Sequence, residues 1–246
     1  MIRFFAPDIE NTLTLPETES GHCCRVLRMK EGDTIYVVDG KGGAFECRIV
    51  NAHPKHTEVD IISKSIEPLH WKPRITLAVA PTKNIDRMEW LLEKGEEIGV
   101  NEIVFLKCEH SERKEVKDER MEKILVSAMK QSMKATMPEF MGMITFKQFI
   151  ARINSEYSGA IKIMGYCSPE YPRRELVQVY EPGKDVVILI GPEGDFSPEE
   201  VDAAVGAGFI PSTFGNTRLR TETAALYSLT AIHVLNNILE CNSTTI

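Results

Sequence analysis

The sequence has 246 residues, 43% of them hydrophobic and 26% charged, and its formal net charge at pH 7 is −7. This composition is ordinary for a folded water-soluble protein, and no apolar run approaches the ~18 residues of a membrane span. The acidic balance argues mildly against a nucleic-acid partner, because such domains are usually basic, although local basic patches matter more than the total.

The N-terminus and the cysteines indicate a cellular compartment. The chain becomes polar as early as Asp8, which is too soon for a secretory signal peptide. The cysteines show no Cys-x-x-Cys spacing, so they indicate reduced thiols rather than a disulfide framework or a zinc site. His53 and His56 lack a second pair of ligands, and we expect no metal. These features predict a cytoplasmic protein without a membrane segment.

Residues 1–70 are predicted to form a β-rich domain. Short apolar segments separated by turn signals are typical of a small barrel, and the run from Asp39 to Gly43 predicts a hairpin turn. A helix is expected over residues 19–29. Strands are expected over residues 2–5, 12–15, 34–38, 44–50 and 58–62. A module for oligomerisation or packing is the alternative interpretation.

Pro68 and Pro73 mark a linker, and a second domain is predicted over residues 74–246. Its apolar pattern alternates between strand-like runs and helical spacing, which is typical of a parallel α/β sheet. Strands are expected over residues 75–80, 103–106, 141–144, 160–164, 186–190 and 209–214, and helices over residues 85–98, 119–134, 146–153, 198–207 and 222–239.

The segment around residues 186–200 is the clearest candidate for a binding loop. An unbroken apolar run predicts a strand buried on both faces, and Ser197, Pro198 and Glu200 predict the start of a helix. Ligands of α/β sheets bind at such carboxyl ends of strands. Glu193 and Asp195 would repel phosphate, so the loop suits a cationic or donor-rich ligand such as S-adenosylmethionine. An ordinary tight turn is the alternative.

A second loop runs from Phe214 to Ala225 and leads into the last helix. Gly191-Pro192-Glu193-Gly194 and Leu219-Arg220-Thr221-Glu222-Thr223-Ala224 together resemble the signature of the RsmE-type 16S ribosomal RNA (uracil N3)-methyltransferases, in the SPOUT superfamily. The resemblance covers nearly the whole chain. It implies a PUA-like RNA-binding barrel in the first domain and a trefoil knot in the second. It also implies S-adenosylmethionine as cofactor, the small ribosomal subunit as partner, and a homodimer.

The reaction that the resemblance implies needs a base for the N3 proton and a donor to the uracil oxygens, and particular residues are candidates for these roles. Arg220 is the candidate for stabilising a uracil anion, and Glu222 is the candidate base. N3 lies on the pairing edge, so the uridine must be unpaired or extruded. The expected cofactor-binding residues are Met164, Ile190, Gly191, Pro192, Glu193, Gly194, Phe214, Gly215, Leu219, Arg220, Thr223 and Ala224. Phosphate or RNA contacts are expected from Arg3, His22, Arg25, Arg28, Lys83, Arg87, Lys94 and Gln131.

Two positions depart from the family pattern. Asp195 stands where the family usually has the last glycine of Gly-Pro-Glu-Gly-Gly, and the arginine expected at Thr217 is displaced to Arg218. Two alternative functions stay open on the sequence. One is methylation of another RNA position, such as a ribose 2′-hydroxyl. The other is an RNA-binding ribosome-assembly factor without catalytic activity.

Overall fold

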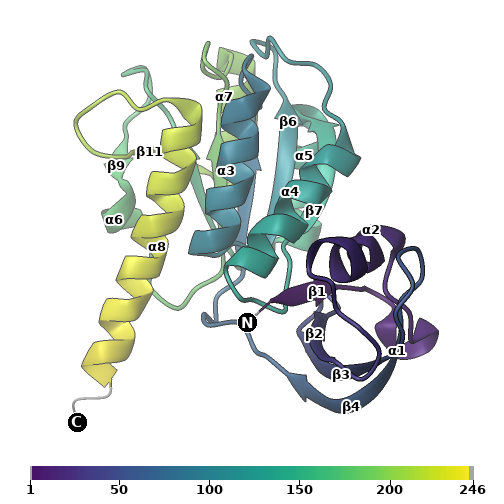
Figure 1. Ribbon diagram of the computed structural model, residues 1–246. Coiled ribbons are helices and arrows are strands. Elements are labelled where there is room, and N and C mark those ends of the chain that lie inside the picture. Colours follow the sequence, from purple (N-terminus) through teal and green to yellow (C-terminus); the bar gives the residue numbers. More distant parts are fainter. Residues whose placement is uncertain (1, 244–246) are drawn as a thin grey trace. The chain divides into compact units, whose positions relative to one another are not determined.

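A computed structural model describes residues 2–243, which divide by their contacts into two compact units (Figure 1). One unit comprises residues 1–70 and 125–137, and the other comprises residues 71–124 and 138–246. The chain therefore leaves the second unit once and returns to it. Met1 and residues 244–246, at the outer ends of the two predicted domains, lie outside the described residues.

The first unit contains a four-stranded sheet in the order β1-β2-β3-β4. β1 pairs parallel with β2, and the other pairs are antiparallel. Phe4, Ile35 and Phe45 are buried in its core, since alternate side chains of each strand face the same side. The strands are β1 (Arg3–Phe5), β2 (Thr34–Val38), β3 (Gly43–Asn51) and β4 (Glu58–Ile66).

The strand predicted over residues 12–15 is wrong. The short helix α1 (Ile9–Thr12) includes the first of these residues, and Thr14 makes only an isolated antiparallel bridge to Glu58. The Thr12 hydroxyl donates back to the carbonyl oxygen of Asp8, a local bond that competes with a strand. The helix predicted over residues 19–29 also differs, because α2 (Glu17–Gly21) passes into a π-helical turn, η1 (His22–Val26).

The segment 125–137 includes the second half of α4 (Asp118–Gln131) and packs within the first unit. Lys130 Nζ lies 2.6 Å from Glu19 Oε1, and the Gly42 N–H donates to the carbonyl oxygen of Ala135 at 2.9 Å. α4 ends before Met133, which adopts a positive φ of 59°. The helix predicted over residues 119–134 therefore ends three residues earlier than expected, at Gln131.

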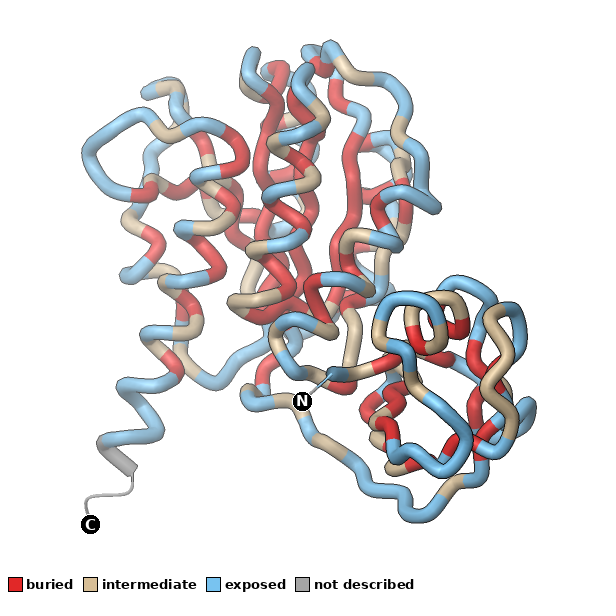
Figure 2. The backbone as a smooth tube through the Cα atoms, in the orientation of Figure 1, coloured by how far each residue is buried: buried red, intermediate tan, exposed pale blue. Residues whose placement is uncertain are grey.

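The second unit contains a seven-stranded sheet in the order β7-β6-β5-β10-β8-β11-β9, with every recorded pair parallel. The central strands β5 and β10 are buried along their whole length, as the red tubes in Figure 2 show. The parallel α/β prediction is confirmed. The strands are β5 (Ile75–Val79), β6 (Glu102–Lys107), β7 (Glu139–Thr145), β8 (Ile161–Gly165), β9 (Arg174–Glu175), β10 (Val186–Ile190) and β11 (Ile210–Thr213).

Helices cover both faces of this sheet. α3 (Ile85–Ile98) and α8 (Thr221–Ser243) lie side by side on one face (Figure 1). α5 (Phe146–Glu156) and α7 (Pro198–Gly206) contact each other and pack on the core of the opposite face. No sequence signal predicted β9 or the short helix α6 (Leu176–Val179). The trefoil knot stays a prediction.

Across the described residues, no helix has the length and apolarity of a membrane span.

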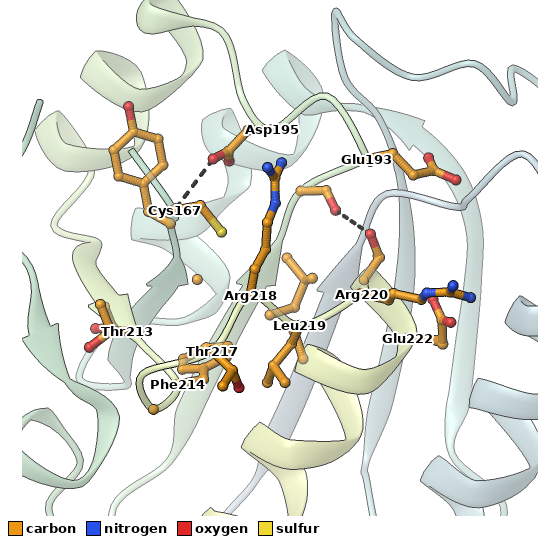
Figure 3. A pocket seen from close by; sticks show the side chains of 18 of the residues that line it. Cys167, Glu193, Asp195, Thr213, Phe214, Thr217, Arg218, Leu219, Arg220 and Glu222 are labelled. Carbon is orange, nitrogen blue, oxygen red and sulfur yellow. Dashed lines mark hydrogen bonds between the residues drawn. The ribbon is translucent and has the colours of Figure 1, made fainter. Parts of the chain in front are cut away.

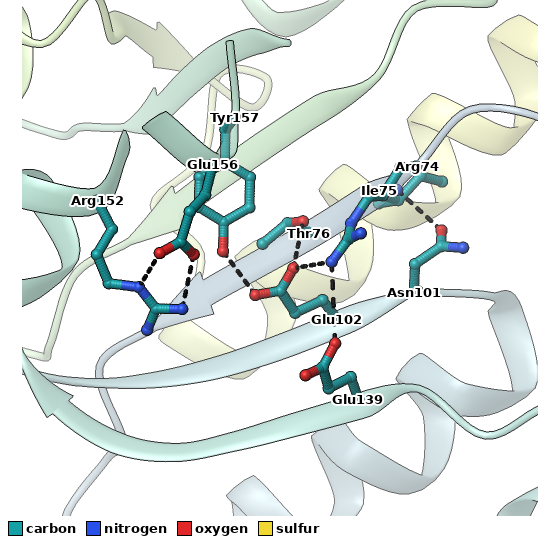
Figure 4. A network of polar contacts seen from close by, with 9 residues as sticks. All are labelled: Arg74, Ile75, Thr76, Asn101, Glu102, Glu139, Arg152, Glu156 and Tyr157. Carbon is teal, nitrogen blue, oxygen red and sulfur yellow. Dashed lines mark hydrogen bonds and ion pairs between the residues drawn. The ribbon is translucent and has the colours of Figure 1, made fainter. Parts of the chain in front are cut away.

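The amino ends of the strands carry a buried polar network around Glu102, which is 2% exposed (Figure 4). Its carboxylate accepts hydrogen bonds from the Tyr157 hydroxyl at 2.6 Å and from Arg74 Nη2 at 2.7 Å. The Thr76 hydroxyl donates to it as well, at 3.3 Å. A buried carboxylate is costly unless it is paired and hydrogen-bonded, and these donors meet that requirement.

Candidate functional site

A cavity of about 850 Å³ opens at the carboxyl ends of β8, β10 and β11 (Figure 3). These strands are direct neighbours, with Ile190 in register with Gly165 and Gly165 in register with Ser212. The loops that follow them, residues 166–173, 191–197 and 214–220, therefore emerge at the same edge of the sheet. The site is thus assembled from segments that are separate in sequence.

Glycines let the walls of the cavity pack closely. A Cβ added at Gly165 would stand 2.9 Å from Cε2 of Phe214, and one at Gly191 would stand 3.0 Å from Cε2 of Phe196. A Cβ at Gly194 would meet the Cβ of His110 at 2.9 Å. Such distances are shorter than ordinary van der Waals contacts. Glycine is therefore required by packing between protein segments at these positions.

Most of the cofactor-binding residues expected from the sequence line this cavity. They are Ile190, Gly191, Pro192, Glu193, Phe214, Gly215, Leu219, Arg220 and Ala224, together with the candidate base Glu222. Met164, a residue of β8, lies instead in the buried core to which α5 and α7 also contribute. Gly194 and Thr223 are not among the lining residues.

Sequence reasoning missed several lining residues. Those after β8 are Cys167, Ser168 and Arg173, and others are Thr82, Glu175, Ser212 and Thr213. The segment after β8 has no glycine-rich motif, so only its place after a predicted strand could have indicated it. Which strands are neighbours in the sheet is decided by the topology.

Hydrogen bonds from neighbouring segments hold the loops in place. Glu193 Oε1 accepts the Lys83 N–H at 3.0 Å, and Arg113 Nε donates to the carbonyl oxygen of Thr82 at 3.1 Å. Arg173 Nη1 donates to the carbonyl oxygen of Cys167 at 2.7 Å. Burial raises the pKa of the Cys167 thiol, and the nearby Asp195 carboxylate raises it further. This cysteine is therefore a protonated thiol at neutral pH.

Glu222 is the buried carboxylate of the site, at 6% exposure. Its Oε1 lies 3.6 Å from Arg87 Nη1, whereas Oε2 accepts no hydrogen bond from the described residues. Arg87, expected as an RNA contact, thus lines the cavity beside Glu222. A buried acceptor without a donor costs ~1–3 kcal/mol, so this oxygen has capacity for a donor from a ligand.

The other expected RNA contacts fall into two groups. Three of the cations are already paired: Arg3 with both oxygens of Glu67, Lys83 with Glu112, and Lys94 with Glu93 and Glu97. Arg25, Arg28 and Gln131 are exposed in the first unit, and His22 is half-buried against the Phe4 ring.

Two arginines of the last loop differ from these paired cations. Arg218 and Arg220 both line the cavity, and Figure 3 shows their side chains extending in different directions. Neither guanidinium has a hydrogen bond or ion pair with another described residue. Together with the walls formed by Ile190, Phe214 and Leu219, they give the site apolar surfaces, free cations and one buried carboxylate.

Comparison with known families yields two matches. Residues 70–233 match a model described as an RNA methyltransferase domain, and residues 15–62 match a model described as an RNA methyltransferase PUA domain. The first match covers more than half of the chain.

Three known proteins are similar over almost the full length. The crystal structure of a probable rRNA-methyltransferase from Porphyromonas gingivalis is 45% identical, with a TM-score of 0.90, covering 97% of this chain and 100% of that one. A ribosomal RNA small subunit methyltransferase E from Neisseria gonorrhoeae, bound to S-adenosyl methionine, is 29% identical with a TM-score of 0.81, covering 96% and 98%. The protein of the same name from Synechocystis is 29% identical, covering 92% and 74%.

Proposed function

The chain belongs to the RNA methyltransferase family, as an S-adenosylmethionine-dependent enzyme that methylates 16S ribosomal RNA, and we propose that the methylated atom is N3 of a uridine. The observation that carries this proposal is the buried carboxylate of Glu222, with an oxygen that lacks a donor, in a cavity that also holds free arginines. An N–H donor, which uracil N3 supplies, matches that oxygen.

The cavity fits S-adenosylmethionine. Its volume of about 850 Å³ is within the usual range for small-molecule sites, and its walls combine apolar side chains with loop backbone. The residues that would hold the cofactor are those of the loops 191–197 and 214–220, with the loop 166–173 closing the third side. When bound, S-adenosylmethionine supplies an electrophilic methyl group on a sulfonium centre.

Glu222 and Arg220 have different roles toward the uracil: the first accepts a proton and the second stabilises the resulting negative charge. Neutral N3 carries a proton and is a poor nucleophile, so a base must accept that proton; we assign Oε2 of Glu222 to this step. Arg87 Nη1 lies 3.6 Å from Oε1, so the other carboxylate oxygen of Glu222 is the one left open to the uracil. As the proton leaves, negative charge spreads to the two uracil oxygens, and the guanidinium of Arg220 donates hydrogen bonds to that charge.

Nucleoside mass spectrometry tests this function. Unmodified small ribosomal subunits incubated with the protein and S-adenosylmethionine should yield 3-methyluridine. Glu222→Gln should lower kcat by about 10²-fold or more, the usual contribution of a general base, and leave cofactor affinity unchanged. Ribose-methylated product would contradict the assignment of N3, and unmodified RNA would contradict the activity.

RNA binding is assigned to the first unit, on the strength of the PUA-domain match over residues 15–62. Arg25 and Arg28 are exposed there and have no hydrogen bond or ion pair among the described residues, so their charges are available for phosphates. Arg28 follows η1 at a positive φ of 55°, a conformation that directs the chain away from the helical turn. These cations give an acidic chain a local basic surface.

We infer a homodimer from the last helix. Ala225, Leu229 and Ile232 are fully buried on one side of α8. On other sides Tyr227, Val234 and Ile238 are 42%, 49% and 53% exposed. A helix that is apolar nearly all round is expected to be covered on more than one side, and two-fold dimers are the commonest way to cover it.

A further inference from the structure

Asp195 has a backbone conformation that is unfavourable for a residue with a side chain. Its φ is 62°, in the left-handed region that residues other than glycine rarely adopt. The family pattern that the chain resembles has glycine at this position. An aspartate kept in a conformation suited to glycine is expected to have a role for its side chain.

The side chain of Asp195 joins two loops. Its Oδ2 accepts the N–H of Cys167 at 3.2 Å, and its Oδ1 accepts the N–H of Phe196 at 2.9 Å. Figure 3 shows the first of these bonds crossing the upper part of the cavity. Cys167 lies in the loop after β8 and Phe196 in the loop after β10, so the contact links walls that are 28 residues apart in sequence.

The backbone of Asp195 is fixed from the other side. Its carbonyl oxygen faces Nδ1 of His110 at 3.1 Å, in the segment after β6, and its N–H donates to the carbonyl oxygen of Pro192 at 3.0 Å. Gly194 packs directly against His110, where a Cβ would be only 2.9 Å away. The aspartate is therefore held in place and can act as an anchor for the loop after β8.

In the loop after β8, the backbone of Cys167 is held by hydrogen bonds at both its N–H and its carbonyl oxygen. Its N–H donates to the carboxylate of Asp195, and its carbonyl oxygen accepts from the guanidinium of Arg173 at 2.7 Å. Hydrogen bonds with a charged partner are roughly twice as strong as neutral ones. Both polar groups of this residue are thus held by charged side chains, at a point where the loop lines the cavity.

We propose that Asp195 is a positioning residue of this enzyme, whose carboxylate fastens residues 166–173 to residues 191–197 and so forms the cofactor pocket before the cofactor binds. The proposal rests on the proposed function, because it treats these loops as the S-adenosylmethionine site. Without the carboxylate, the loop after β8 would be ordered only on binding, and the entropy of ordering would reduce affinity.

Two substitutions separate the side chain from the backbone conformation. Asp195→Gly removes the carboxylate and adopts the positive φ without strain. Asp195→Asn keeps an oxygen acceptor for the Cys167 N–H and tolerates the left-handed conformation. Asp185→Gly is the matched control, since Asp185 also accepts a backbone N–H, from Arg74 at 2.8 Å, but lies at the opposite end of β10.

The first readout is cofactor binding by calorimetry and steady-state kinetics. Loss of one charge-assisted tether in Asp195→Gly should raise the Kd and KM for S-adenosylmethionine about tenfold, with kcat within about twofold. Asp195→Asn should change KM by less than about threefold, and Asp185→Gly should not change it. A general loss of structure would instead lower kcat and Tm as well. An effect of Asp195→Asn equal to that of Asp195→Gly would overturn the acceptor role.

The second readout is hydrogen exchange of the Cys167 amide in the cofactor-free protein, which needs no activity. Exchange should become faster in Asp195→Gly and stay close to the parent rate in Asp195→Asn and Asp185→Gly. Unchanged exchange in Asp195→Gly would overturn the tether, even if the parent protein binds S-adenosylmethionine. Failure of the parent protein to bind S-adenosylmethionine would contradict the proposed function, and the exchange experiment would still test the tether.

Discussion

Gly165 has no side chain, and this leaves room for the ring of Phe214 at the wall of the cavity. An added methyl group would lie 2.9 Å from Cε2 and 3.1 Å from Cζ of Phe214, and 3.2 Å from Cδ1 of Ile190. Both neighbours line the cavity. The residue is at the end of a strand without a positive φ, so a substitution acts through packing rather than through backbone strain.

Gly165→Ala should therefore push Phe214 from its position and weaken S-adenosylmethionine binding. We expect an increase in Kd of about tenfold by calorimetry, which corresponds to the ~1–3 kcal/mol typical of overpacking. Gly206→Ala is the control, because a Cβ there meets nothing within 4 Å and the φ is ordinary. Equal affinities for both variants would show that Phe214 does not contact the cofactor.

Among the elements, α7 begins with a capping box that also ends a loop of the site. The Ser197 hydroxyl accepts the Glu200 N–H at 3.3 Å, and Glu200 Oε2 accepts the Ser197 N–H at 3.0 Å. Glu200 Oε1 accepts the N–H of Glu109 as well, at 2.9 Å, which links the helix start to the segment after β6. α5 has the same kind of cap, formed by Thr145 and Gln148, away from the cavity lining.

Ser197→Ala and Thr145→Ala should each lower the free energy of unfolding by about 1 kcal/mol, the usual value of an N-cap. Only Ser197→Ala should also weaken S-adenosylmethionine binding, since Ser197 closes the loop 191–197. Chemical denaturation and calorimetry measure the two effects. A parallel loss of affinity in Thr145→Ala would mean that helix stability in general, rather than this loop, controls the site.

The network at the amino ends of the strands gives the second unit a pH dependence. Burial raises the pKa of Tyr157 above its ordinary value of 10.0, and the hydrogen bond to the Glu102 carboxylate raises it further. Arg152 acts in the opposite direction, and Glu156 in the same direction. Between the two pKa values the unfolded chain has lost the Tyr157 proton and the folded chain keeps it, so unfolding releases a proton.

The free energy of unfolding should therefore fall as the pH rises above about 10. Tyr157→Phe should make this fall shallower, while lowering stability at neutral pH because Glu102 loses a buried donor. Denaturation at several pH values between 8 and about 11 measures the slope for both proteins. Equal slopes would show that Tyr157 does not titrate differently in the folded and unfolded chains.

On the scale of the whole molecule, the exposed apolar residues of α8 make the proposed homodimer testable. Val234→Glu or Ile238→Glu places a charge on an exposed apolar position, so the subunit should fold while the dimer dissociates. Sedimentation should show a dimer for the parent protein and a monomer for these variants. Val205→Glu, at an apolar position of α7 that is 38% exposed, is the control and should remain dimeric. A folded, fully active parent monomer would contradict the proposal.

Local chemistry allowed several elements to be predicted from the sequence. The run Val186–Ile190 is a buried strand, and Ser197 caps the next helix, both as predicted. These signals lie within a few residues of one another, so no distant segment can change them. The same holds for the start of the last helix, which was predicted at residue 222 and lies at Thr221. Residues 12–15 show the limit, since α1 extends to Thr12 and only an isolated bridge at Thr14 forms in place of the expected strand.

The partners of these elements were decided by tertiary structure. No local sequence signal indicates that β8 lies between β10 and β11. No local signal indicates either that residues 125–137 belong to the first unit. The ion pair of Arg3 with Glu67 and the contact of Asp195 with Cys167 likewise join residues far apart in sequence. Periodicity specifies which face of a strand or helix is buried, but it does not specify what covers that face. Long-range packing determines which side chains meet in the site.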